Sequence, residues 1–571
     1  MRLPLRLGLT PALLFVLSPI APVGAQGPAA THYEAVTDRG ARAKPALPAP
    51  GIAGSSFIDP AFGTRVWRIS DAATRPARPD RSYRTPSGSH QNAWSLSGRD
   101  FFVVSTDGTV VPFSFDPQTG RASRIAPSPS DEGGLVLRFY IEPHFSYRHD
   151  GVIYGAASGG SLRTIDQYNF ATAAYTRLID LDTVAGGLAG TYVGGIGSSA
   201  GPSERLMTFF GGSSQDRHFY LLVFDPANPS SRRLLNTRTS SLDGRSTNLR
   251  LDFLLHAAAI DRSGRYVTLY PTSADRAAPR QAAPNYLWDL ATDVFTELPG
   301  IAARSNGHDA YGYGVRVNQD CCTSTSWDAA QWQVRALASP LVTRDVISPV
   351  LSPRQVYLAD HPSWHNARPD VWTPFISALY RYGGNTVEWR AWDDEIVAVQ
   401  TGDPGGEVWR LAHHRSDVRH DTDSSRISFW YTPRPNVSPD GRWVLFTSNW
   451  EKTLGNDPGG DQGGGARQDV FLLRLNTSGV TPVPGPDPIA TVAITTSTLP
   501  DARVRRVYSA RLSATGISGE PNWRVATGAL PPGIVLHPRT GALGGAPREA
   551  GTFTFTVAVA GASRTFSLTV R

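Results

Sequence analysis

Lysine, cysteine and long apolar runs are scarce in this chain of 571 residues. Only Lys44 and Lys452 are lysines, so scattered arginines carry almost all of the basic charge. Nucleic-acid binding requires basic residues that cluster on one face, so this distribution predicts no nucleic-acid partner. Beyond the first 25 residues no run reaches the roughly 18 apolar residues of a membrane-spanning helix, and no membrane span is expected.

The only two cysteines, Cys321 and Cys322, are adjacent. Cysteine-based metal sites space their ligands by two or more residues, which excludes a zinc ribbon. Neighbouring Cα atoms lie about 3.8 Å apart, below the usual disulfide range, so a vicinal disulfide would be strained. A disulfide, favoured by export to an oxidising compartment, and two reduced thiols in a turn both stay open.

Residues 1–25 have the pattern of a secretory signal peptide. Arg2 and Arg6 give a positive start, Leu7–Ile20 is apolar, and Val23-Gly24-Ala25 is a small-residue cleavage site. The mature chain is therefore expected to be exported, to the periplasm, the cell surface or the medium. Its net charge would be +4, because 53 basic residues then stand against 49 acidic ones.

A strand–turn–strand unit recurs along the chain and is clearest at Pro433–Ser448. There Pro439-Asp440-Gly441 has the residue types of a tight turn between two strands. Related turns have Gly98, Gly151 and Gly264, and the gaps between the four glycines are 53, 113 and 177 residues. These gaps are close to one, two and three multiples of about 57, and such a period with short strands predicts propeller blades.

Extrapolation of the period predicts further turns at Pro202–Arg205, Asn318–Thr323 and Tyr380–Asp394, and hence seven blades. A first strand is expected near Ser56, and Arg65–Ile69 is expected to be an outer strand that closes the ring. The fold class is therefore all-β. The predicted order is a signal peptide (1–25), a linker rich in Ala, Pro and Gly (26–54), a seven-bladed β-propeller (55–478), a linker (479–488) and a β-sandwich (489–571).

The segment Ser-Pro-Asp-Gly-Arg-Trp-Val-Leu-Phe-Thr-Ser at 438–448 resembles the recurring signature of bacterial WD40-like, TolB-type propellers. The resemblance extends over about residues 55–478 and implies stacked blades around a central channel. Four tryptophans on strand patterns are expected to pack between blades: Trp67, Trp288, Trp409 and Trp443.

Histidines precede three of the turn glycines by seven or eight residues, at His90, His144 and His256, and Arg434 stands near this place in the last blade. Equivalent positions in stacked blades occupy equivalent places around the axis. We therefore expect these four residues to meet at one opening of the channel as catalytic groups. Imidazole suits this task because it titrates near neutrality and serves as acid, base or metal ligand.

Other predicted strand starts complete the candidate site. Metal ligands for Mn²⁺, Zn²⁺ or Fe²⁺ are expected at His308, His361 and His365. Substrate-binding residues are expected at Gln91, Tyr311, Trp364 and Tyr431, because sugars stack on aromatic faces, although packing is an equal alternative for Trp364. The histidine placement loosely resembles that of oligogalacturonate lyases, and this resemblance implies a channel metal held by histidines and a glutamine.

The composition shifts beyond residue 488 to alternating Thr, Val and Phe, as in Thr552–Val557. Trp523, Leu530-Pro531-Pro532-Gly533 and Gly551–Phe555 resemble the Ig-like, cadherin-like modules of bacterial surface proteins. The few acidic residues are widely separated, so no strong calcium site is expected.

Two functions are compatible with these patterns. The first is a polysaccharide lyase that cleaves uronate-containing glycans by β-elimination at the histidine-rich opening. The second is a non-catalytic scaffold at the surface or in the periplasm that binds a carbohydrate or a protein. The expected partner is accordingly an acidic polysaccharide or a cell-surface protein.

Overall fold

The computed structural model of the chain describes residues 29–571. The exceptions are residues 43, 89–90, 126–133, 136, 138–142, 157–162, 186–192, 212–217, 273–283, 299–308, 321–330, 347–359, 366, 369–372, 382–390, 403–405, 424–426, 460–464, 478–492, 516–520, 522 and 560–561.

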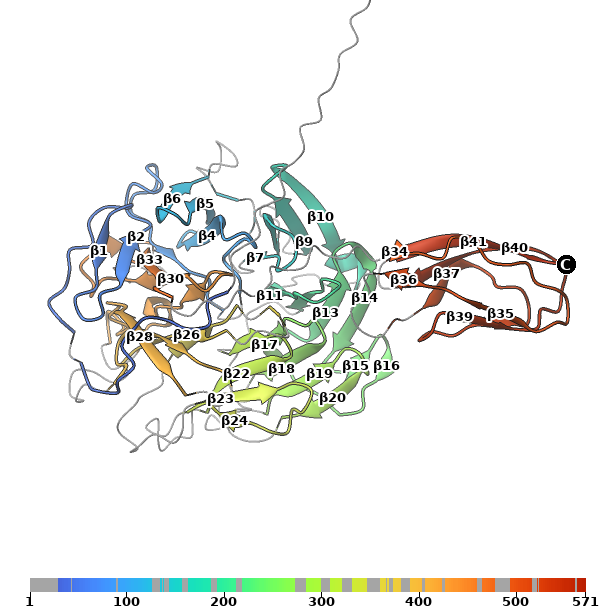
Figure 1. The fold of residues 1–571 in the computed structure, drawn as a ribbon. Coiled ribbons are helices and arrows are strands. Elements are labelled where there is room, and N and C mark those ends of the chain that lie inside the picture. The colour runs from blue at the N-terminus through green and yellow to red at the C-terminus, as the bar shows by residue number, and fades with distance from the viewer. Residues whose placement is uncertain are drawn as a thin grey trace, which may run out of the picture.

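Seven antiparallel sheets of four to six strands follow one another in the first part of the chain, and they are the blades of a β-propeller (Figure 1). The predicted all-β, seven-bladed fold is therefore confirmed. The first strands of three neighbouring pairs of blades contact one another, as expected for strands nearest the axis: β7 (His144–Phe145) with β11 (Val193–Ser198), β11 with β17 (Leu255–Ile260), and β21 (Ala310–Gly312) with β25 (Asp360–Ser363).

We number the blades in chain order. Blade I has β3 (Tyr83–Arg84), β4 (Asp100–Ser105), β5 (Val110–Asp116) and β6 (Arg121–Arg124); blade II has β7 (His144–Phe145), β8 (Val152–Ala156), β9 (Thr164–Asn169) and β10 (Ala174–Asp180). Blade III has β11 (Val193–Ser198), β12 (Leu206–Phe210), β13 (Tyr220–Asp225), β14 (Asn228–Asn236), β15 (Ser241–Leu242) and β16 (Arg245–Ser246). Blade IV has β17 (Leu255–Ile260), β18 (Tyr266–Pro271), β19 (Tyr286–Asp289) and β20 (Val294–Glu297).

The remaining blades complete the ring. Blade V has β21 (Ala310–Gly312), β22 (Val315–Asp320), β23 (Gln331–Ala336) and β24 (Arg344–Asp345); blade VI has β25 (Asp360–Ser363), β26 (Phe375–Leu379), β27 (Glu395–Val399) and β28 (Val408–His413). Blade VII has β29 (Asn436–Val437), β30 (Trp443–Ser448), β33 (Asp469–Arg474), β2 (Arg65–Arg68) and β1 (Ser56–Ile58). Short elements outside the blades are η2 (Leu181–Thr183), η5 (Phe429–Tyr431) and the hairpin of β31 (Asn456–Asp457) and β32 (Gly465–Ala466).

Blade VII is built from both ends of the propeller segment, as predicted. Strand β2 pairs along β33, and β1 covers the outer edge of β2. Because the two ends of the segment share one sheet, their pairing closes the ring and leaves fewer free strand edges.

The recurring turn has a simple chemical basis. The turn glycines at 98, 151, 264 and 441 all have φ between 65° and 72°, a conformation that glycine adopts without steric cost. Three residues before the glycine, a side-chain oxygen of Ser95, Asp261 or Ser438 accepts the backbone N–H that follows the turn, at 2.8–3.0 Å.

The extrapolated turns are only partly correct. Pro202–Arg205 lies between β11 and β12, as predicted. Asn318 lies inside β22, and the turn of blade V is instead at Gly314, with φ 70°. Tyr380–Asp394 connects β26 to β27, whereas the first connection of blade VI spans residues 364–374. A constant period of about 57 residues does not predict the turns of blades V and VI, because the connections between their strands differ in length from those of the other blades.

Aromatic side chains fill the spaces between blades, as predicted for the four tryptophans. Trp443 of blade VII contacts Phe115 of blade I, with ring centres 4.9 Å apart, and Trp67 on its own blade at 5.5 Å. Trp288 and Trp409 are buried in equivalent clusters. These aromatic side chains therefore pack each blade against the next.

Residues 29–42 and 44–50, which composition assigned to a linker, pack between blades VI and VII; we call them the N-terminal strap. Tyr33 is buried in the cluster between these blades and donates a hydrogen bond to the Gly441 carbonyl at 2.9 Å. Val36 forms a bridge with Arg410 of β28, and Trp450 donates to the Pro48 carbonyl at 2.7 Å.

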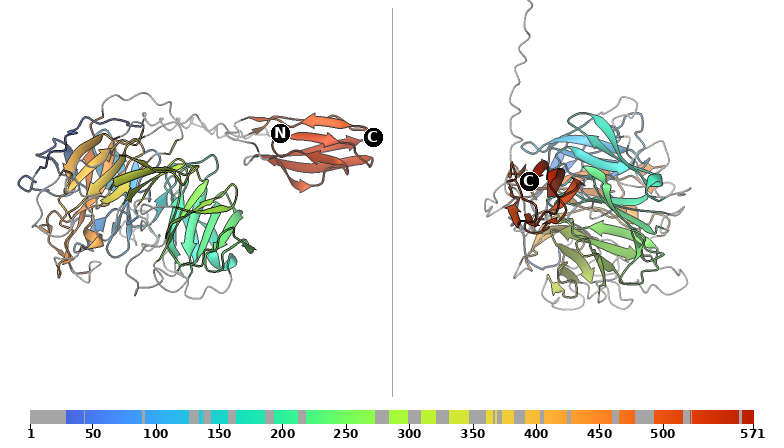
Figure 2. Two further views of the ribbon diagram at one scale, coloured as in Figure 1. Left: turned by 90° about the horizontal axis from the view of Figure 1, so that it is seen from below. Right: turned by 90° about the vertical axis from the view of Figure 1, so that its right-hand side faces the viewer.

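The C-terminal residues form separate small sheets around a core that contains Trp523 and Phe555 (Figure 2). The sheets are β34 (Ala493–Ile494) with β36 (Ala514–Thr515); β35 (Tyr508–Arg511), β39 (Ala542–Gly545) and β38 (Ile534–Leu536); and β37 (Arg524–Gly528), β40 (Gly551–Val559) and β41 (Ala562–Val570). Two three-stranded sheets that share a core make a β-sandwich.

Candidate functional site

The predicted catalytic residues stand at the beginnings of inner strands. His144 begins β7, His256 is the second residue of β17, and Arg434 precedes β29. His361, predicted as a metal ligand, is the second residue of β25. His144, His361 and Arg434 are buried, whereas His256 is exposed.

Around two of these residues lies a group that we call the start cluster: Arg84, His361, Phe429, Trp430 and Arg434. The rings of Phe429 and Trp430 are 5.0 Å apart between centres, and His361 meets Phe429 edge-on at 5.5 Å. The Arg84 guanidinium carbon lies 3.8 Å from the Trp430 ring centre, and that of Arg434 lies 5.3 Å from both rings. Cations at this distance are attracted to the aromatic faces.

The start cluster combines buried cations with accessible rings. Arg84 and Arg434 are 1% and 2% exposed, whereas Phe429 is 37% exposed and Trp430 is half-buried. Arg434 also has a left-handed backbone with φ 39°, and its carbonyl accepts a hydrogen bond from the Thr85 hydroxyl at 2.6 Å. Such strain persists only where surrounding contacts hold it, so Arg434 is fixed in place.

A hydrogen-bonded seam lies next to the start cluster. The Asn436 side chain accepts from Ala93 N at 3.0 Å and donates to the Gln91 carbonyl at 2.7 Å. His144 Nδ1 accepts from Asn92 N at 2.7 Å. The Gln91 side chain accepts from Gly88 N at 2.8 Å. Gln91 and His144 thus take part in contacts that join blades VII, I and II.

A second group, the end cluster, lies where inner strands finish: Tyr147 after β7, Arg262 after β17 and His365 after β25. The Arg262 guanidinium carbon is 4.0 Å from the Tyr147 ring centre. His365 meets Tyr147 at 4.9 Å, and His144 meets it at 5.3 Å. Tyr147 therefore joins residues of blades II, IV and VI.

Burial controls the protonation of the end cluster. Burial, with a smaller repulsion from Arg262, lowers the pKa of His365 to about 3, so the imidazole is neutral at physiological pH. Burial raises the pKa of Tyr147 to about 12, against the lowering effect of Arg262. The cluster holds a neutral imidazole and a neutral phenol beside a guanidinium.

The aromatic residues predicted to bind substrate make internal contacts. Trp364 is 2% exposed and donates to the Thr373 carbonyl at 2.8 Å, in the core between blades V and VI. Tyr311 is buried and its hydroxyl contacts that of Tyr270. Tyr431 is buried and donates to Asp421. All three side chains are thus packed inside the protein.

His90, His308, Cys321 and Cys322 lie outside the described residues. Within the described part of the chain, no group of three or more His, Cys, Asp or Glu side chains could hold a metal ion. His361 and His365 contact different aromatic partners. The described residues alone therefore do not make the expected metal site.

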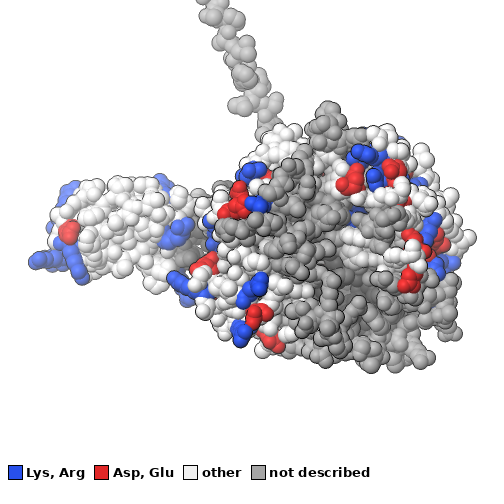
Figure 3. All heavy atoms as spheres, turned by 180° about the vertical axis from the view of Figure 1, so that it is seen from behind, with Lys and Arg blue, Asp and Glu red and all other residues white. Residues whose placement is uncertain are grey.

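The most exposed part of the start cluster was missed from the sequence, because Phe429 and Trp430 lie in η5, outside the strand repeat. The run Phe429-Trp430-Tyr431 just before an inner strand is the signal that could have revealed it. On the face in Figure 3, basic and acidic side chains are interspersed, in agreement with the scattered arginines of the sequence.

Comparison with known proteins covers both parts of the chain. Residues 488–571 match the family model described as "Putative Ig domain", which supports the Ig-like character of the C-terminal sandwich. No curated protein matches the chain. The described residues contain no helix with the length and apolar character needed to cross a membrane.

Solved structures with a similar arrangement have low sequence identity. TolB from Acinetobacter baumannii is 12% identical, with 46% of this chain and 54% of TolB covered and a TM-score of 0.28, so the chain spans about half of TolB. The hydrazine synthase of Kuenenia stuttgartiensis is 9% identical (70% and 98% covered, TM-score 0.38). The WD40 repeats of RRP9 are 11% identical (69% and 98% covered, TM-score 0.34).

Proposed function

We propose that this chain is an exported, non-catalytic scaffold that binds an acidic glycan at the start cluster. The observation that carries the proposal is the exposed ring of Phe429 beside Trp430, with the Arg84 guanidinium 3.8 Å from the Trp430 ring centre. Aromatic faces stack on sugar rings. The guanidinium groups of Arg84 and Arg434 lie against these rings, and positive charge attracts carboxylates.

Burial favours binding over catalysis as the main function. A general base must come within hydrogen-bond reach of the proton that it removes. His144 is fully buried and His361 is 1% exposed. His365 is 9% exposed. A polymer reaches these imidazoles only after the propeller opens, whereas the Phe429 ring is already accessible.

Export and the role of the C-terminal module belong to the same proposal. The signal-peptide pattern of residues 1–25 supports export, and the Ig-like module suits a spacer or an adhesion domain at the cell surface. N-terminal sequencing of the protein from fractionated cells tests this part. A mature chain that begins near residue 26 outside the cytoplasm is expected, and an intact Met1 in the cytoplasm would contradict it.

Calorimetric titration with uronate oligosaccharides and neutral oligosaccharides of equal length tests the binding site. The wild-type protein should prefer the uronate, and added salt should weaken the interaction. The double variant Phe429→Ala/Trp430→Ala should bind about 10- to 30-fold more weakly, since each ring contributes about 1 kcal/mol. Tyr175→Ala removes an exposed ring from blade II and is the matched control. Equal losses in both variants would reject the site.

A second candidate function is β-elimination at the end cluster, which the contact of Tyr147, Arg262 and His365 favours. Arg262 would neutralise the uronate carboxylate, the neutral His365 imidazole would remove the adjacent proton, and Tyr147 would protonate the leaving oxygen. Ultraviolet absorbance of the unsaturated product tests this function. Product formation that His365→Gln abolishes would establish it, and intact polymer would leave binding as the function.

A further inference from the structure

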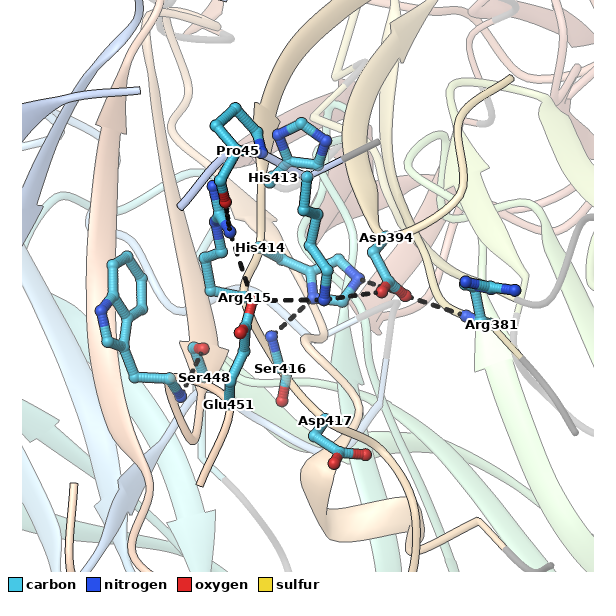
Figure 4. Close-up of polar contacts among 12 residues, drawn as sticks. Pro45, Arg381, Asp394, His413, His414, Arg415, Ser416, Asp417, Ser448 and Glu451 are labelled. Atoms are coloured by element: carbon cyan, nitrogen blue, oxygen red, sulfur yellow. Dashed lines mark hydrogen bonds and ion pairs between the residues drawn. The ribbon is translucent and has the colours of Figure 1, made fainter. Parts of the chain in front are cut away.

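The N-terminal strap ends in a partly buried cluster of charges that the proposed function does not use (Figure 4). Lys44 Nζ lies 3.0 Å from Asp394 Oδ2 in blade VI and 3.3 Å from Glu451 Oε1 in blade VII. Arg415 lies 3.2 Å from Glu451 and donates to the Pro45 carbonyl at 2.9 Å. Charge contacts therefore tie the strap to both blades.

His414 lies on the other side of Asp394. Its Nε2 is 2.8 Å from the Leu379 carbonyl and 3.8 Å from Asp394 Oδ1, while its Nδ1 accepts from Ser416 N at 3.0 Å. These contacts require a proton on Nε2 and a lone pair on Nδ1. A second proton would break the contact with Ser416 N and place a new positive charge near Lys44.

The backbone around this cluster is strained. Asp394, Arg415 and the run Trp450-Glu451-Lys452 all have positive φ, between 50° and 63°. A non-glycine residue in this conformation costs roughly 1–2 kcal/mol and needs surrounding contacts to hold it. The charge contacts of the strap are among the contacts that hold this backbone in place.

We propose that the N-terminal strap is an acid-operated clasp, which protonation of His414 releases from blades VI and VII. Among the described residues, the charged and titratable groups that face His414 are Asp394 before β27, Lys44 on the strap and His413 on β28. A protonated His414 competes with Lys44 for Asp394. The strap loses its ion pair with blade VI as a result.

The direction of the pH dependence follows from burial. Burial lowers the pKa of His414 from 6.5 to about 4, against a raising effect of Asp394 and with a further lowering effect of Lys44. Opening exposes the imidazole and restores its ordinary pKa, so the open state binds the proton more tightly below pH 6.5. The closed state therefore loses stability as the pH falls from 6.5 towards 4.

Hydrogen exchange of peptides from residues 29–50 tests the clasp in the full-length protein. After correction for intrinsic exchange rates, protection should fall by roughly 30-fold between pH 7.5 and pH 5, the ratio expected from the two pKa values. Peptides from β12 and β13 of blade III should keep their protection. Strap protection that is equal at the two pH values would overturn the proposal.

Two variants separate the clasp from a general loss of stability. His414→Gln cannot titrate and should keep strap protection constant between pH 7.5 and pH 5, whereas the exposed control His537→Gln should behave as wild type. Lys44→Met removes the charge contact from the strap side and should lower strap protection even at pH 7.5. An unchanged Lys44→Met strap, or a His414→Gln strap that still opens in acid, would overturn the proposal.

Discussion

The start cluster and the end cluster contain the same kinds of residue but expose them differently. Each joins an arginine, a histidine and an aromatic ring. At strand starts Phe429 is 37% exposed, whereas at strand ends Tyr147 is 5% exposed. Residue type therefore does not distinguish a binding surface from a cluster that only stabilises the fold. The exposure of the side chains to solvent does distinguish them.

The largest difference in stability between the two clusters is expected when the central aromatic ring of each is truncated. Tyr147→Ala should lower the free energy of unfolding by about 3–4 kcal/mol, because it leaves a cavity among three blades. Phe429→Ala should cost about 1 kcal/mol or less, because water already reaches the ring. Chemical denaturation measures both values. Equal losses would break the distinction between support and surface.

The seam next to the start cluster should tolerate little change. Asn436→Ala leaves Ala93 N and the Gln91 carbonyl without their hydrogen bonds in a buried position. We expect a loss of about 2–3 kcal/mol in the free energy of unfolding. Asn228→Ala, an exposed change on β14, is the control. A loss no larger than that of the control would show that the seam does not support the cluster.

The end cluster should also produce an acid-dependent loss of stability. His365 is neutral in the folded protein because burial lowers its pKa to about 3, whereas the unfolded imidazole binds a proton below its ordinary pKa of 6.5. Stability from this residue is present above pH 6.5 and is lost as the pH falls towards 3.

The expected loss from His365 is about 2 kcal/mol between pH 6.5 and pH 5. His365→Gln should remove this component, measured as the difference from wild type in denaturation at the two pH values. His537→Gln in the C-terminal module should not. A pH dependence that survives His365→Gln unchanged would contradict the burial of this imidazole.

The smallest effect concerns the contact inside the start cluster. A double-mutant cycle of Arg84→Met and Trp430→Ala should give a coupling energy of about 1 kcal/mol for the cation–π contact at 3.8 Å. The same cycle with Arg84→Met and Tyr175→Ala should give none, because Tyr175 lies on blade II. Zero coupling in the first cycle would show that Arg84 does not stabilise the Trp430 ring.

The repeat predicted the blades well, because its turn glycines need a left-handed backbone that few other residues adopt. Gly98, Gly264 and Gly441 all occupy this conformation. The sixth blade was placed incorrectly, because its first connection spans residues 364–374 and has no such short turn. The spacing of residues in the sequence reveals where short glycine turns occur. It does not reveal how long the connection between two strands is when that turn is missing.

The candidate site was harder to predict than the fold. The histidine spacing located strand starts, and His144 and His256 do lie there. Spacing along a strand does not reveal what covers a side chain from a neighbouring blade, so the burial of Tyr311 was not predicted, and for Trp364 packing stayed one of two alternatives. Contacts between blades decide accessibility, and they join residues far apart in the chain.

Hydrogen exchange of the full-length protein with and without a uronate oligosaccharide, with analysis of the recovered sugar, distinguishes binding at the start cluster from catalysis at the end cluster. Binding without catalysis predicts new protection in peptides that contain Phe429 and Trp430, together with an unaltered oligosaccharide. Protection confined to peptides that contain Tyr147 and His365, accompanied by unsaturated sugar products, would contradict the proposed function and establish the end cluster as the site of catalysis.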